Sequence, residues 1–300
     1  MSKQKFWRGV LPAITTPFDA NGAIDHAFLA DHAKRMIAAG CGGIVPLGSL
    51  GEGNALMFEE KLAVLRTLVE TLPEHPVIPG IGAFSTGEAV RLAREAEKIG
   101  CRGLMVLPPY VYVGDAEEMQ THVSAVIDAT KLPCLLYNNP IAYRTDFLPE
   151  HIAALAERHA NLEAVKESST DVRRVTAIRA LIGDRLDILV GVDDAIVEGV
   201  AAGAVGWIAG LVNAYPKESV RLFELAREGK HVEVDALYRW FLPLLRLDTV
   251  PKFVQLIKLT QQQVGMGSER VRAPRRVLAG AEREATLALI AEAEHNKPEV

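Results

Sequence analysis

Continuous apolar runs alternate with amphipathic segments along most of the chain. Near residues 38–48, 98–108 and 201–210, the end of an amphipathic segment is followed by glycine and then by an apolar run. Glycine suits a left-handed helix terminus, and a run that is apolar on both faces predicts a parallel strand buried on both sides. Five further apolar runs bring the strand candidates to eight, and these lie at 10–18, 77–82, 133–139, 162–168 and 187–191.

Hydrophobic residues spaced by three and four positions predict helices between these strands, most clearly over 29–37, 62–72 and 89–96. Strict alternation of strand and helix through about residue 229 predicts a parallel sheet with right-handed crossovers. Eight such units match a closed (β/α)8 barrel. An open doubly wound sheet is the main alternative, but such a sheet usually has fewer strands and a glycine-rich first turn. The chain contains neither GxGxxG nor GxxxxGK[ST].

The strand pattern stops after residue 230, where three further stretches have helical periodicity: 231–247, 250–264 and 281–295. We therefore predict an α/β fold, a (β/α)8 TIM barrel over residues 1–230 with a C-terminal helical extension over 231–300.

Composition excludes several classes of protein. The chain has 300 residues, a formal net charge of −5 and no block of like charges, which argues against a nucleic-acid or anionic-membrane surface. No apolar run approaches the roughly 20 residues that span a bilayer. Residues Met1–Arg8 are polar and basic, which predicts no signal peptide. The odd set of three cysteines does not suit a disulfide framework, so we expect reduced thiols and a cytoplasmic protein.

Lys166 is the strongest candidate for chemistry. It lies inside the apolar run LEAVKES, where a charge is costly unless it is paired or functional. A lysine that attacks a carbonyl must be the neutral amine, and burial among apolar strands lowers the pKa of a lysine toward that state. The structural alternative is a lysine that is ion-paired at the barrel mouth, for instance to Glu167 or Asp193.

Tyr137 ends the strand that precedes Lys166 in the chain. Adjacent strands lie about 4.8 Å apart, so we expect its phenol to reach the Lys166 amine or its substrate and to transfer protons. The alternative is a tyrosine that caps the barrel core.

The segment GSLGE, which contains Ser49, offers backbone N–H groups in a tight turn that suit a carboxylate; an ordinary strand-to-helix loop is the alternative. We expect Asp193 and Asp194 to cap the following helix, and Cys134 and Trp207 to be core residues. The eight histidines show no metal-ligand spacing, which argues against a metal site.

The motifs GSLGE, YNNP, VKES and GVDD, in this order and spacing, resemble those of the N-acetylneuraminate lyase / dihydrodipicolinate synthase family. The resemblance covers essentially the whole chain. It implies a (β/α)8 barrel with C-terminal helices, usually a homotetramer. It also implies class I aldolase chemistry on a small 2-keto acid such as pyruvate, with no metal or organic cofactor.

The resemblance assigns roles to individual residues. Lys166 matches the Schiff-base lysine and Tyr137 the proton-transferring tyrosine. The four positions that hold the keto-acid carboxylate or line the pocket are matched by Ser49, Leu50, Gly191 and Ile208.

Three departures concern the second substrate of the family's dihydrodipicolinate synthases. Those enzymes typically have two threonines where this chain has Ser49 and Leu50. Their Tyr-Tyr pair, which completes a proton relay, reads Tyr110-Val111 here, with Tyr112 as a candidate substitute. Their substrate-binding arginine has its counterpart in Arg144, which lies about two residues later along its loop.

The sequence thus predicts a Schiff-base-forming lyase that acts on a small 2-keto acid or its cyclic imine. The YNNP and WFLPLLRLD segments resemble enzymes that act on 1-pyrroline-4-hydroxy-2-carboxylate, or related keto-acid aldolases and dehydratases. The alternative within the family is 4-hydroxy-tetrahydrodipicolinate synthase. A keto-acid binding protein without turnover and, more distantly, a metal-dependent barrel enzyme are alternatives of other classes.

Overall fold

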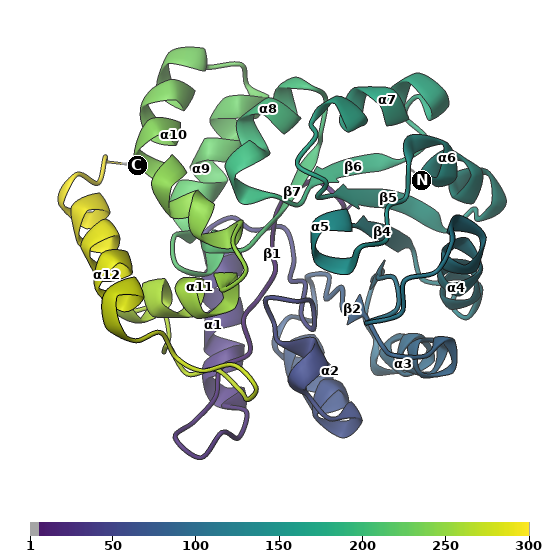
Figure 1. The fold of residues 1–300 in the computed structure, drawn as a ribbon, viewed down its shortest axis with the longest axis horizontal. Helices are drawn as coiled ribbons and strands as arrows, with labels where there is room; N and C mark the ends of the chain where they lie inside the picture. Colours follow the sequence, from purple (N-terminus) through teal and green to yellow (C-terminus); the bar gives the residue numbers. More distant parts are fainter. Residues whose placement is uncertain (1–5, 300) are drawn as a thin grey trace.

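A computed structural model of the protein describes residues 6–299, so the expectation for the first five residues lies outside it. In this part of the chain a seven-stranded parallel sheet curls round in the order β1-β7-β6-β5-β4-β3-β2 (Figure 1). Its strands are β1 Gly9–Pro12, β2 Gly80–Ile81, β3 Leu104–Val106, β4 Cys134–Asn138, β5 Leu162–Glu167, β6 Asp187–Val190 and β7 Gly206–Ala209.

The eighth predicted strand closes the gap between β1 and β2. Ile44 pairs with Val77 and Val45 pairs with Ala13, both in parallel. The N–H of Val45 donates to Pro12 O at 2.8 Å, and the N–H of Gly80 donates to Pro46 O at 2.8 Å. Prolines on all three segments remove backbone donors, so this stretch forms bridges rather than a long ladder. The prediction of a (β/α)8 barrel is therefore confirmed.

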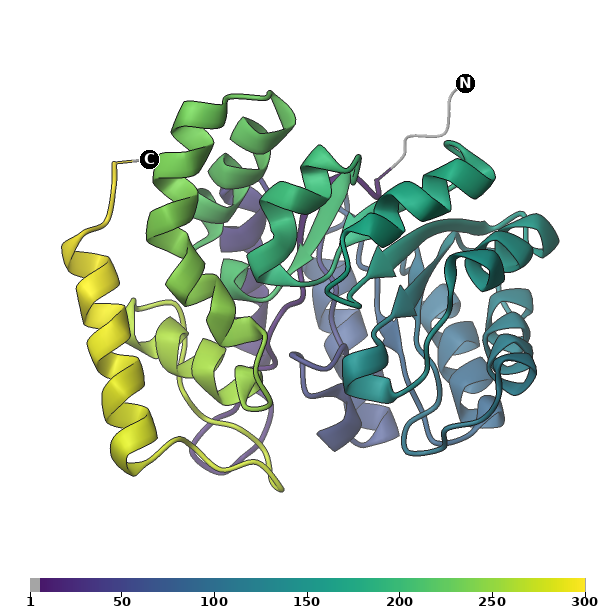
Figure 2. The same cartoon turned by 45° about the horizontal axis from the view of Figure 1, so that its top comes forward.

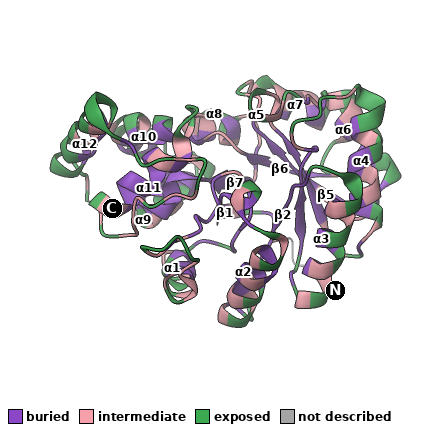
Figure 3. Cartoon of the chain, turned by 60° about the horizontal axis from the view of Figure 1, so that its bottom comes forward, coloured by how far each residue is buried: buried purple, intermediate pink, exposed green. Residues whose placement is uncertain are grey.

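The barrel helices surround this ring. They are α1 His26–Ala38, α2 Phe58–Thr71, α3 Thr86–Ile99, α4 Ala116–Asp128, α6 Pro149–Arg158, α7 Arg173–Ile182, α8 Ile196–Ala201 and α9 Pro216–Arg227, with the single turn α5 Pro140–Tyr143 after β4. Local signals fix their ends. In α3, the Ser85 side chain accepts from Glu88 N, and Gly100 ends the helix with a φ of 104°. Figure 3 shows buried strands inside and helices that expose only their outer faces.

Three helices follow the barrel, as the periodicity predicts: α10 His231–Leu245, α11 Phe253–Gln263 and α12 Gly280–His295. They gather on one side of the barrel (Figure 2). Specific bonds hold them there, because Tyr215 of the α8–α9 connection donates to Glu294 at 2.9 Å and Trp240 donates to Ala293 O at 2.8 Å. In the described residues no helix is both long and apolar enough to cross a bilayer.

Candidate active site

The carboxyl ends of the parallel strands surround a cavity of about 370 Å³. Lys166 of β5 and Tyr137 of β4 are paired in register, so their side chains point to the same face of the sheet. Both line the cavity, and both are buried, with exposed fractions of 6% and 5%. The prediction that neighbouring strands bring these two residues together is therefore confirmed.

The contact between them differs from the one expected. The Lys166 Nζ lies 4.2 Å from the centre of the Tyr137 ring, over its face rather than at its hydroxyl. The hydroxyl instead accepts from Asn139 Nδ2 at 2.9 Å. The amide of Asn139 thus holds the phenol oxygen in place.

The ion pairs that would make Lys166 structural are not formed with residues 6–299. Glu167 accepts from Ser169 N at 2.7 Å and from Asn138 Nδ2 at 3.0 Å. Asp193 accepts from Leu211 N at 2.8 Å, and also from Gly210 N. Both carboxylates are therefore occupied elsewhere, and the lysine amine faces the cavity.

Asp193 corrects one expectation. Its carboxylate does not cap α8, whose start has no side-chain cap. It accepts instead from the turn after β7 and from Trp207 Nε1 at 3.0 Å, and burial raises its pKa to about 6. Trp207 and Cys134 are fully buried, as expected of core residues. The three cysteines are free and buried, and burial raises the pKa of each thiol to about 12.

Gly191 leaves room for the lysine. A Cβ built at this position would lie 2.5 Å from Lys166 Cε and 2.0 Å from Ser168 Oγ. Any larger residue would displace the lysine side chain. Ile208, from the neighbouring strand, forms the apolar part of the same wall.

The loop after the second strand supplies another wall through Ser49 and Leu50. Neither residue donates its backbone N–H to a carbonyl within the described part of the chain. Two free N–H groups at a cavity surface suit a carboxylate. The Ser49 hydroxyl is hydrogen-bonded to the hydroxyl of Tyr143, a residue of α5 that sequence reasoning did not single out.

Tyr143 stands between two other tyrosines. Its ring centre lies 5.7 Å from that of Tyr137 and 5.8 Å from that of Tyr110. Burial, with the neighbouring phenols, raises the pKa of Tyr143, and burial raises that of Tyr110 to about 12. Tyr110 thus lies against Tyr143 and is not part of the cavity lining.

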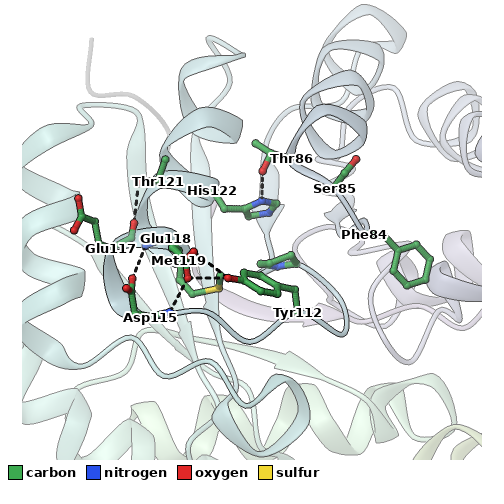
Figure 4. A pocket seen from close by; sticks show the side chains of 11 residues that line it. Phe84, Ser85, Thr86, Tyr112, Asp115, Glu117, Glu118, Met119, Thr121 and His122 are labelled. Atoms are coloured by element: carbon green, nitrogen blue, oxygen red, sulfur yellow. Dashed lines mark hydrogen bonds between the residues drawn. The ribbon is translucent and has the colours of Figure 1, made fainter.

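Two candidates for the second substrate lie away from the cavity. Arg144 ends α5 with a φ of 59° and is exposed to solvent. Tyr112 is 54% exposed, and its hydroxyl donates to Glu118 at 2.9 Å. Figure 4 shows Tyr112 in a separate, more open hollow of about 460 Å³ that also contains His122. No lysine lines that hollow in the described residues.

Two further lining residues were missed from the sequence. The Ser168 hydroxyl, 1% exposed as a residue, has no hydrogen-bond partner in the described structure. Asp248 lies beyond β7, in the segment between α10 and α11; it ends the WFLPLLRLD segment, which was noted as a resemblance without a role for this residue. Within residues 6–299, no group of three or more histidine, cysteine, aspartate or glutamate side chains is arranged to hold a metal ion.

Comparison with known proteins relates this chain to a known family. Residues 6–293 match the model of the "Dihydrodipicolinate synthetase family". A 4-hydroxy-tetrahydrodipicolinate synthase from Geotalea uraniireducens is 34% identical over 291 residues, which are 95% of this chain and 98% of the relative. One from Natronomonas pharaonis is 37% identical over 222 residues, 74% of this chain and 75% of the relative. The crystal structure of a dihydrodipicolinate synthase from Acinetobacter baumannii, complexed with pyruvate, is similar with a TM-score of 0.91 at 26% identity, covering 96% of this chain and 99% of that one.

Proposed function

This chain belongs to the dihydrodipicolinate synthetase family of lyases, and from that membership we propose that Lys166 forms a Schiff base with a small 2-keto acid such as pyruvate. One observation carries the proposal: the Lys166 amine faces the cavity over the Tyr137 ring and has no ion pair with the described residues. A neutral amine in this position is free to attack a carbonyl.

The surrounding residues receive roles in this proposal. The free N–H groups of Ser49 and Leu50 hold the carboxylate of the keto acid. Tyr137 transfers protons while the carbinolamine forms and loses water. Gly191 and Ile208 shape the wall beside the lysine. Catalysis through an imine requires neither a metal nor an organic cofactor, so we expect turnover to persist in the presence of a chelator.

For the overall reaction, the curated relatives support 4-hydroxy-tetrahydrodipicolinate synthesis better than any other candidate. In that reaction the pyruvate imine condenses with aspartate semialdehyde. We therefore propose the synthase reaction as the first to assay. It takes precedence over the hydroxypyrroline reaction that the YNNP and WFLPLLRLD segments suggest.

The hydroxypyrroline reaction remains the second candidate because three positions do not suit the aldehyde substrate of the synthase reaction. Arg144 is exposed, Tyr112 is bonded to Glu118, and Leu50 lacks a hydroxyl, so none of them offers the polar groups expected for the aldehyde substrate. A cyclic imine that already carries its carboxylate would exchange onto Lys166 without a second substrate.

Assembly and location complete the proposal. Three exposed apolar side chains are Phe84, which lines the hollow of Figure 4, Val111, and Ile141 of α5. Exposed apolar side chains of this kind suit contact with another copy of the chain, and we propose a cytoplasmic homotetramer. Sedimentation velocity of the purified protein tests the tetramer. We also propose that residues 1–230 and 231–300 are its two structural parts.

Borohydride trapping tests the central claim. Incubation with pyruvate and borohydride should add one reduced pyruvyl group, and peptide mass spectrometry should place it on Lys166. Turnover is then compared between pyruvate plus aspartate semialdehyde and 1-pyrroline-4-hydroxy-2-carboxylate. Trapping without turnover of any keto-acid substrate would favour the non-catalytic binding protein, and an adduct on another residue would contradict the assignment of Lys166.

A further inference from the structure

One wall of the cavity comes from outside the barrel strands. The segment between α10 and α11 contributes Asp248, Thr249, Val250 and Pro251 to the lining, and Phe253 adds the first residue of α11. Asp248 is the one acidic side chain in that lining. Part of the cavity wall is thus built by the C-terminal helical extension.

Asp248 is packed closely but has no bonded partner. A Cβ built on Gly210 would lie 2.1 Å from Asp248 Oδ1, so the carboxyl group rests directly on that glycine. Neither a hydrogen bond nor an ion pair joins Asp248 to any other residue in the range 6–299. Asp248 as a whole residue is half-buried, while its carboxyl group lies within the cavity wall.

The neighbouring acids are already satisfied. Asp193 accepts hydrogen bonds from Leu211 N and Trp207 Nε1. Asp194 lies 3.6 Å from the guanidinium of Arg246. Among these three carboxyl groups, only Asp248 is left to interact with a ligand.

A second unpartnered polar atom faces the same cavity. Ser168 Oγ is buried without a hydrogen-bond partner and lies beside Gly191, two residues after Lys166. Buried polar atoms are rarely left without partners in folded proteins, so a ligand atom is the expected partner. The Ser168 hydroxyl and the Asp248 carboxyl together can bind a group that donates hydrogen bonds.

We propose that Asp248 binds a protonated nitrogen of the substrate, an amino or iminium group, and thereby selects nitrogen-bearing substrates over nitrogen-free ones. This inference rests on the proposed function, since it takes the keto-acid carboxylate to bind the N–H groups of Ser49 and Leu50. A carboxylate and a protonated nitrogen form a charge-assisted hydrogen bond, which is among the stronger polar contacts in proteins. Both candidate reactions include such a nitrogen: the amino group of aspartate semialdehyde and the ring nitrogen of the hydroxypyrroline.

The electrostatics agree with this role. Burial and the nearby Asp193 raise the pKa of Asp248, while the charge of Lys166 acts in the opposite direction. A bound cation lowers the pKa of a neighbouring carboxyl group. A protonated nitrogen bound beside Asp248 therefore favours its ionised form, whereas a nitrogen-free substrate does not.

The test compares Asp248→Asn with the unmodified protein on two aldehydes at saturating pyruvate. Aspartate semialdehyde carries the amino group, and succinate semialdehyde is the same aldehyde without it. We expect Asp248→Asn to raise KM for aspartate semialdehyde about 10- to 100-fold, the effect of losing a hydrogen bond to a charged group. KM for succinate semialdehyde and the rate of pyruvate trapping should stay within about twofold.

If turnover is found only with the hydroxypyrroline, the same comparison uses that substrate and nitrogen-free 4-hydroxy-2-oxopentanoate. Asp194→Asn is the matched control, because it makes the same substitution in a neighbouring acid that is paired with Arg246 and does not line the cavity. Its selectivity should equal that of the unmodified protein.

The outcomes separate the inference from the proposed function. Normal pyruvate trapping with unchanged selectivity in Asp248→Asn overturns the role of Asp248 alone. Equal losses on both members of a substrate pair overturn it as well, because they indicate a general effect on the cavity. Failure of the unmodified protein to be trapped by pyruvate overturns the Schiff-base function, and the inference with it.

Discussion

Lys166 and Lys258 are both buried, and their surroundings differ. The Lys258 Nζ of α11 donates to Thr16 O and Glu52 Oε1, both at 2.7 Å, and to Arg270 O at 2.6 Å. Lys166 has no such partner among residues 6–299, although its exposed fraction of 6% is close to the 1% of Lys258. Each amine lies over an aromatic ring, that of Phe18 or of Tyr137. Burial and ring contact are shared, so neither distinguishes the two.

The two lysines differ in how many of their N–H groups donate hydrogen bonds to the protein. An ammonium group has three N–H donors, and Lys258 satisfies all three with fixed acceptors. Such a lysine is held as part of the fold and cannot approach a carbonyl. Lys166 faces a cavity, and its amine has no hydrogen-bond partner among residues 6–299, so it is available to a ligand. Hydrogen bonding and access to the cavity, rather than burial, therefore distinguish Lys166 from Lys258.

Lys166→Met is the largest expected change in activity. Without the amine no imine forms, so pyruvate trapping should disappear and turnover should fall by about 10⁴-fold or more. The free energy of unfolding should change by less than about 1 kcal/mol, because no hydrogen bond with the described residues is lost. Intact-protein mass spectrometry and urea titration measure both quantities. Persistent trapping in this variant would show that another lysine is the nucleophile.

Tyr137→Phe should reduce kcat by about 10²- to 10⁴-fold, because it removes a positioned proton-transfer group while it keeps the ring beneath the lysine. Steady-state kinetics at saturating substrate give the value. Tyr110→Phe is the control, since its hydroxyl is not part of the cavity lining. A rise in KM alone, with kcat preserved, would be incompatible with a proton-transfer role.

Lys258→Met should produce the opposite pattern to Lys166→Met. Removing one partner of a buried ion pair typically costs about 3–5 kcal/mol, because Glu52 stays buried without its nearer cation and keeps only Arg275 at 3.6 Å. The loss should be at the lower end, since Arg272 N still donates to Glu52 at 3.0 Å. Urea titration measures the stability, and trapping per folded molecule should be retained. A Lys258→Met variant that keeps its stability but loses trapping would contradict our view of Lys258 as a structural lysine.

Tyr143→Phe is the smallest expected effect. Its hydroxyl is bonded to that of Ser49, and the loss of one such bond should raise KM for pyruvate about 2- to 10-fold through a less fixed Ser49. The kcat should change little. Ser49→Ala should give a rise of similar size, and the double variant should add nothing further. Fully additive effects would mean that the two hydroxyls act separately.

The sequence predicted the barrel because its apolar runs and glycine-ended helices follow one repeating pattern. It also predicted that Lys166 and Tyr137 meet, since both sit at the carboxyl ends of neighbouring strands and the observed register pairs them. The second strand was predicted as an element but forms only two bridges. Short proline-containing pairings of this kind cannot be distinguished from full strands by hydrophobicity.

Contacts between distant segments were not predictable in the same way. Asp248 reaches the cavity through the packing of α10 and α11, which no local pattern encodes. Tyr143 follows Tyr137 in the chain, yet only the single turn α5 reveals that it bends back to Ser49. Arg144, the next residue, was expected near the substrate and points to solvent because α5 ends there with a left-handed backbone. Lys258 lies in a helical apolar stretch like many others, and its acceptors come from remote loops.

The pair of Glu52 and Lys258 also has a consequence for how the chain folds. The two residues are 206 positions apart, so Glu52 is synthesised long before its counterion. A buried carboxylate without its cation is strongly unfavourable, and contacts of such long range form slowly. Since Glu52 closes the loop that begins with Gly48 and Ser49, we expect that loop to settle only after α11 has docked. One of the first loops of the barrel to be synthesised should therefore be among the last to reach its native form.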